Sequence, residues 1–144
     1  MKYQKIILIV SLSVVLLFLF FNTNRHFFIK KFSFKPFNAF DFKLSNLQGK
    51  EIKLTDYKGK AIVLTFWASW CPSCKMDLRI FSELISNTDL KGVEILTITL
   101  DDSASLVTRL FNELGITPNF EVLLDGDKKV ASTYEVFSVP ETFI

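Results

Sequence analysis

Two cysteines carry the main chemistry that this 144-residue sequence offers, because Cys71 and Cys74 are its only cysteines. A thiolate at one of them can attack a disulfide of another molecule, and the other thiol, two residues away, can then resolve the mixed disulfide. Half of a zinc site, or two buried structural thiols, would show the same spacing. Zinc needs further ligands, and the sequence after residue 40 has no histidine and no third cysteine. We therefore predict a redox-active pair without a metal or an organic cofactor, with structural thiols as the alternative.

The elements around the cysteines would place them at the start of a helix. Residues 61–66 (AIVLTF) are nearly all apolar or β-branched, which is typical of a strand buried on both faces of a parallel sheet. Residues 72–86 carry one apolar stripe at helical spacing, and Pro72 suits a first helical turn. Helix N-termini lower the pKa of a thiol from about 8.5 to roughly 3.5–7.5. Cys71 is thus the predicted nucleophile, and Cys74, one turn deeper, the resolving thiol.

The rest of the sequence after residue 40 alternates between strand and helix patterns. The predicted elements are a hairpin of strands 42–44 and 51–54, a strand over 93–100, a helix over 106–114 that Ser103 caps and Gly115 ends, a strand over 120–124, a short helix over 128–134, and the start of a strand at 142–144. This alternation predicts an α/β fold with right-handed crossovers.

The charge of the chain is unevenly distributed. Six of the 17 Lys/Arg residues lie in residues 1–35, which contain no Asp or Glu, so residues 36–144 carry 11 basic against 15 acidic residues. A mildly acidic domain without a basic cluster lacks the electrostatic footprint that attracts a phosphate backbone. We therefore expect no nucleic-acid partner.

The N-terminal segment has the composition of a membrane anchor. Residues 6–21 are sixteen uncharged and strongly apolar residues, slightly fewer than the roughly 20 that span a bilayer. A buried core helix and a cleaved signal peptide are the alternatives, although no Ala-x-Ala-like site and no cysteine for lipid attachment follow. We predict an uncleaved, bilayer-binding anchor in residues 1–24, a juxtamembrane linker in residues 25–39, and one domain in residues 40–144. Basic residues flank both sides of the anchor, so charge alone does not set its orientation.

Three stretches of the sequence together resemble a known family. The run FWASWCPSC at 66–74, the preceding GKAIV at 59–63 and the later VPETF at 139–143 are similar to motifs of the membrane-anchored, thioredoxin-like TlpA/ResA/DsbE (CcmG) group. The resemblance extends from about residue 40 to the last residue. It implies a thioredoxin-like fold, with a central mixed β-sheet flanked by helices, an N-terminal hairpin extension and one preceding transmembrane helix. The group continues with a further strand and a C-terminal helix, so we expect this domain to be truncated at its C-terminus.

The same resemblance implies roles for several residues besides the cysteines. Pro140 would be a cis-proline that lies beside the cysteines and helps to hold an extended substrate, whereas the alternative is a trans-proline that opens an edge strand. Asp77, three residues after Cys74, stands where many members carry a glutamate thought to assist proton transfer. A helix-surface acid is an equal alternative for Asp77. Trp67 and Trp70 are expected to shape and cover the site rather than to react.

The resemblance also implies a function and a place in the cell. A DsbE-like protein would reduce disulfides of extracytoplasmic proteins such as apocytochrome c, and a membrane electron donor of the DsbD/CcdA type would recharge it. The catalytic domain would face the periplasm or the cell exterior from the cytoplasmic membrane. Alternatives are a dithiol oxidase or isomerase and a redox-inactive, truncated interaction domain. A copper chaperone is opposed by the spacing of the cysteines, and a peroxiredoxin-like peroxidase by the missing proline before Cys71.

Overall fold

The buried strand that leads to the cysteines is an interior strand of the observed sheet. The computed structural model describes residues 39–144, and in it β3 (Ala61–Trp67) pairs in parallel with β4 (Val93–Thr99), which pairs in parallel with β5 (Glu121–Leu124). The register of β3 and β4 places Val63 opposite Ile95 and Phe66 opposite Ile98. The carboxyl ends of all three strands therefore lie at the same end of the sheet, where ligand and active sites of α/β folds are usually found.

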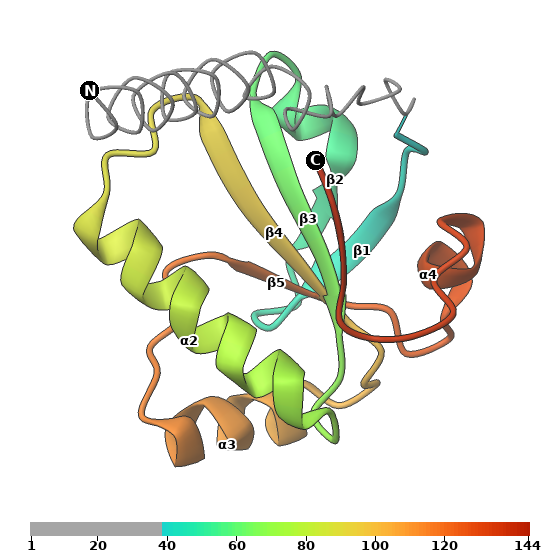
Figure 1. Ribbon diagram of the computed structural model, residues 1–144. Coiled ribbons are helices and arrows are strands. Elements are labelled where there is room, and N and C mark those ends of the chain that lie inside the picture. The colour runs from blue at the N-terminus through green and yellow to red at the C-terminus, as the bar shows by residue number, and fades with distance from the viewer. Residues whose placement is uncertain (1–38) are drawn as a thin grey trace, which may run out of the picture. The chain divides into compact units, whose positions relative to one another are not determined.

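Three antiparallel strands complete the sheet. β1 (Lys43–Asn46) and β2 (Glu51–Lys53) form the predicted N-terminal hairpin, and β6 (Glu141–Phe143) pairs antiparallel with β3. The strand order is β2-β1-β5-β4-β3-β6, with β1 antiparallel to β5. The result is a mixed, six-stranded sheet, of which β1 to β5 are labelled in Figure 1, so the predicted α/β class and the mixed sheet are confirmed.

The helices cover the two faces of this sheet unequally. Side chains of α2 (Pro72–Asn87) and α3 (Ala104–Leu114) pack with Trp67 and Val122 on one face. The other face holds a second cluster, in which Ala131 of the short helix α4 (Lys129–Thr133) and nearby Tyr134 pack against the strands and the hairpin. A single 3-10 turn, η1 (Leu54–Tyr57), lies against that second cluster. The period-2 alternation of β3 explains the division, because consecutive side chains of a strand point to opposite faces.

The helix boundaries follow from local residues. Ser103 caps α3 by accepting the N–H of Leu106 at 3.3 Å, and Gly115 ends it in the left-handed conformation, both as predicted. In α2 the predicted stripe faces the sheet, with Cys74 and Leu78 fully buried. The opposite side of α2 carries exposed apolar residues, namely Met76, Ile80 and Leu84.

The predicted membrane anchor lies outside the described residues. Within residues 39–144, we find no helix that is long and apolar enough to span a bilayer.

Candidate active site

Cys71 and Cys74 are joined by a disulfide at the N-terminus of α2. Cys71 is the N-cap residue, with extended backbone, and its Sγ accepts the N–H of Cys74 at 3.1 Å. Pro72 occupies the first helical turn, where its missing N–H is not needed. The hydroxyl of Ser73 lies 3.4 Å from the same sulfur. The helix N-terminus predicted for Cys71 is therefore confirmed, and the two donors stand where a thiolate would accept hydrogen bonds.

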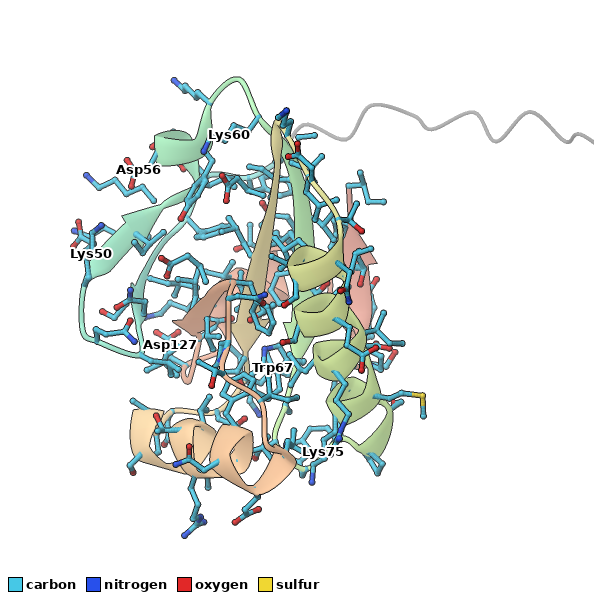
Figure 2. The ribbon with its side chains drawn as sticks, turned by 90° about the vertical axis from the view of Figure 1, so that its left-hand side faces the viewer. Lys50, Asp56, Lys60, Trp67, Lys75 and Asp127 are labelled. Atoms are coloured by element: carbon cyan, nitrogen blue, oxygen red, sulfur yellow. A yellow bond between two sulfur atoms is a disulfide. The ribbon has the colours of Figure 1, made fainter. Side chains whose placement is uncertain are left out.

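Both sulfur-bearing residues are largely covered by the protein. Cys74 is completely buried and Cys71 nearly so, in a cluster with Trp67 and Leu78. Trp67 also packs edge-on against Phe111, with ring centroids 5.8 Å apart. Figure 2 shows Trp67 and Lys75 at the same end of the molecule, where β3 ends and α2 begins. The disulfide is thus seated in the apolar layer between the sheet and its two longer helices.

A loop far along the sequence closes over the disulfide. The carbonyl oxygen of Val139 lies 3.7 Å from Cys71 Sγ, and the following Val139–Pro140 peptide bond is cis. Val139 packs against both hydrophobic clusters, so the loop is fixed from its inner side. In the reduced protein this carbonyl is placed to accept a hydrogen bond from the Cys71 thiol. The structure brings Pro140 beside the cysteines, as the resemblance implied, while its role with substrate stays a prediction.

Asp77 and Trp70, which were predicted to assist the cysteines, differ in how far they are exposed. Asp77 is half-buried on α2, and its carboxylate has no side-chain hydrogen bond or ion pair within the described part of the chain. Trp70 is 69% exposed, directly before Cys71. The buried Trp67 packs in one cluster with both cysteines, and the part of Trp70 in covering the site stays a prediction. Proton transfer by Asp77 stays a prediction.

Asp101 fixes the loop that delivers Cys71, and the sequence analysis missed it. It lies two residues after the end of β4, and its carboxylate accepts hydrogen bonds from the N–H and the hydroxyl of Ser69, both at 2.8 Å. The hydroxyl of Thr99 donates to the same carboxylate at 2.6 Å. Two residues before Cys71, the chain is thus tied to the end of the neighbouring strand. The one available signal was an acidic residue shortly after a parallel strand.

Asp125, directly after β5, anchors a second segment of the site, and the sequence analysis missed it as well. Its carboxylate is 1% exposed and accepts the N–H groups of Val130 at 3.2 Å and Ala131 at 2.8 Å. Burial raises the pKa of Asp125 above its usual value, and the two backbone hydrogen bonds oppose that rise. The helix that it holds, α4, leads through Tyr134 to the Val139–Pro140 loop. Asp125 therefore positions the second of the two loops that meet at the sulfurs.

The described residues offer no evident metal centre. Among residues 39–144, no group of three or more His, Cys, Asp or Glu side chains is arranged to hold a metal ion. What the site does offer is a sulfur pair at a helix N-terminus with a cis-proline loop against it, which is suited to exchange of a disulfide with another thiol.

The fold and the site together define a thioredoxin-like domain with a Cys-x-x-Cys disulfide. The chain belongs to the AhpC/TSA family, whose model matches residues 38–144. It is 36% identical over 104 residues to the thiol-disulfide oxidoreductase ResA of Geobacillus thermodenitrificans, which covers 72% of this chain and 59% of that relative. ResA of Bacillus subtilis is 35% identical over 107 residues, or 74% and 59% of the two chains. The chain thus spans about 59% of the length of these curated relatives.

Solved structures agree with this assignment of the fold. A protein described as thiol:disulfide interchange protein DsbE, from Chlorobium tepidum, superposes with a TM-score of 0.65 at 27% identity and covers 73% of this chain and 72% of its own. The exposed lipoprotein thioredoxin of Streptococcus pneumoniae gives 0.59 at 33% identity, with 72% and 78% coverage. The relation to the ResA/DsbE type that the motifs implied is confirmed.

Proposed function

We propose that this chain is a thiol-disulfide oxidoreductase that reduces protein disulfides through the Cys71–Cys74 dithiol. The observation that carries the proposal is the position of Cys71. Its sulfur caps α2, accepts the N–H of Cys74 and lies against the Val139 carbonyl beside a cis-proline. Relatives named as thiol-disulfide oxidoreductases support the same activity.

In the proposed reaction the Cys71 thiolate attacks one sulfur of a substrate disulfide. A Cys71–substrate bond forms while the substrate S–S bond breaks, and the departing sulfur takes up a proton. Cys74, deprotonated, then attacks Cys71, so that the intramolecular disulfide forms and the second substrate thiol leaves. Two electrons pass from the dithiol to the substrate. Cys74 is completely buried whereas Cys71 keeps 3% exposure, so we take Cys71 as the residue that meets an external sulfur.

The finer part of the proposal concerns direction, partners and location. The PETF run after Val139 supports the DsbE branch, so we take apocytochrome c or a similar extracytoplasmic thiol protein as the substrate. The oxidised pair would then be reduced by a membrane electron donor of the DsbD/CcdA type. The apolar residues 6–21 support attachment to a membrane, and we take the catalytic domain to lie on the outer side of the cytoplasmic membrane because of the resemblance to the DsbE branch.

Trapping of the mixed disulfide tests the activity. The full-length protein is incubated in reduced form with insulin, and the adducts are resolved by non-reducing electrophoresis and mass spectrometry. Wild type should reduce insulin and show little adduct, because Cys74 resolves it. Cys74→Ser should accumulate an insulin adduct on Cys71, whereas Cys71→Ser should form none. Insulin reduction by Cys71→Ser at the wild-type rate, or an inert wild-type protein, would contradict the proposal; the inert protein would favour an interaction domain.

A further inference from the structure

Phe137 is an aromatic side chain that the fold holds in solvent, two residues before the Val139 carbonyl that lies against Cys71 Sγ. Its side chain is 93% exposed, and Trp70 is 69% exposed, which makes them the two most exposed aromatic side chains among the described residues. A single apolar residue at a surface is ordinary and by itself indicates nothing. The location of these two is what distinguishes them, because each belongs to one of the two loops that meet at Cys71.

The backbone around Phe137 is fixed. The N–H of Val136 donates to the Ala131 carbonyl at 2.9 Å, and the N–H of Glu135 donates to the Ser132 carbonyl at 3.1 Å. The side chains of Val136 and Val139, on either side of Phe137, pack against the core. Because the chain is anchored on both sides of Phe137, the direction of the Phe137 side chain is set by the backbone. Its exposure is therefore a consequence of the fold.

Phe137 lies within reach of a substrate bound at Cys71. Val139, two residues further on, has its carbonyl oxygen 3.7 Å from Cys71 Sγ. Two residues of chain span at most about 7 Å, and an extended substrate advances roughly 3.3 Å per residue. A substrate residue within about three positions of the attacked cysteine can therefore contact the Phe137 ring. Trp70, covalently next to Cys71, borders the same region.

We propose that Phe137 determines substrate specificity by packing against an aromatic or large aliphatic side chain close to the substrate cysteine. This inference rests on the proposed function and adds the substrate class to it. The substrate is an extended or unfolded polypeptide segment with an apolar residue beside its disulfide. Contact between two aromatic rings removes apolar surface from water and adds a favourable ring–ring interaction. Small disulfides and polar segments gain nothing from Phe137.

Matched peptide disulfides test the proposal with the full-length protein. Each peptide has one cysteine in mixed disulfide with cysteamine, and a phenylalanine or a serine is placed in turn at each of the three positions on either side of it. The second-order rate constant of reduction is measured by rapid quenching and mass spectrometry. At the best position, wild type should prefer the phenylalanine peptide by about three- to tenfold, the range expected for one aromatic contact. Phe137→Ser should bring this ratio close to one, and Phe137→Tyr should retain most of it.

The controls separate specificity from damage and from the proposed function. Leu84→Ser replaces another exposed apolar residue, on α2 ten residues beyond Cys74, and should leave the ratio as in wild type. An equal loss of rate on both peptides in Phe137→Ser would overturn the inference, since the ratio would be unchanged. A wild-type ratio near one would also overturn it. If that wild type still reduces hydroxyethyl disulfide, the proposed function stands while the inference fails.

Discussion

Two carboxylates at the same end of the sheet hold the two halves of the site, and they do so in different surroundings. Asp101 follows β4 and fixes the loop before Cys71 through Ser69. Asp125 follows β5 and fixes α4, which leads to the Val139–Pro140 loop. The carboxyl ends of neighbouring parallel strands place both aspartates at the same end of the molecule.

The surroundings differ in burial and in the type of donor. Asp101 is half-buried and receives two of its three hydrogen bonds from hydroxyl groups, which water can replace. Asp125 is fully buried, and its partners are backbone N–H groups of α4 that would otherwise have no acceptor at that helix start. The loop before Cys71 is therefore held by hydrogen bonds of Asp101 that water can replace. The half of the site that carries Pro140 depends on an anchor that the fold cannot easily replace.

Removal of the Asp125 carboxylate should give the largest effect. Asp125→Ala leaves two backbone N–H groups without an acceptor, each worth about 1–3 kcal/mol when buried, so we expect a loss of about 3 kcal/mol in the free energy of unfolding. Urea unfolding followed by circular dichroism measures it. Asp127→Ala, at an exposed aspartate on the same turn, is the matched control and should cost much less, because water can replace its carboxylate as the acceptor of the Lys129 N–H. Similar losses for both variants would contradict the anchoring role of Asp125.

Removal of the Asp101 carboxylate should cost less. In Asp101→Ala water can reach the freed Ser69 and Thr99 groups, so we expect a loss of about 1–2 kcal/mol by the same urea titration. The comparison is sharpened by Asp101→Asn, whose amide oxygen can still accept the N–H of Ser69 and should restore part of the loss. A cost for Asp101→Ala that equals or exceeds that for Asp125→Ala would break the proposed difference between the two halves.

The pH dependence of stability should show the smallest effect, and Asp125 contributes to it with the opposite sign to its neighbour Asp127, whose pKa is lowered mainly by hydrogen bonds from Lys129. Because burial raises the pKa of Asp125 above its usual 3.8, the folded state retains the proton to higher pH than the unfolded state does. The stabilisation from this group is therefore fully present below the usual value and is lost as pH rises through the raised native value. Measured against Asp125→Asn, which cannot titrate, wild type should gain stability as pH falls from neutral towards 4. A difference that stays flat or shrinks would contradict the direction of the pKa shift.

The sequence predicted most of the fold because its signals are local. The apolar run of β3, the proline after Cys71, and the cap and end of α3 at Ser103 and Gly115 each depend on a few adjacent residues. These features also place Cys71 at a helix N-terminus. The reactive pair could thus be predicted from sequence, together with the element that holds it.

The remainder of the site depends on contacts between distant segments. Asp101 reaches Ser69 across 32 positions, and the Val139 carbonyl meets Cys71 across 68. No periodicity records such contacts, so the anchoring roles of Asp101 and Asp125 could not be read from the sequence. The outward direction of Phe137 likewise follows from the packing of Val136 and Val139, which only the folded chain shows.

The reduction potential of the Cys71–Cys74 pair tests the central claim most directly. The full-length protein is equilibrated in graded thiol–disulfide buffers, and the fraction of dithiol is measured after alkylation by mass spectrometry. The reductase proposal predicts one reversible two-electron transition with a midpoint below about −200 mV, in the range of glutaredoxins and thioredoxin. A midpoint near about −120 mV, as in DsbA, would instead indicate an oxidase. Two thiols that titrate independently, with no intramolecular disulfide at any potential, would contradict a redox function altogether.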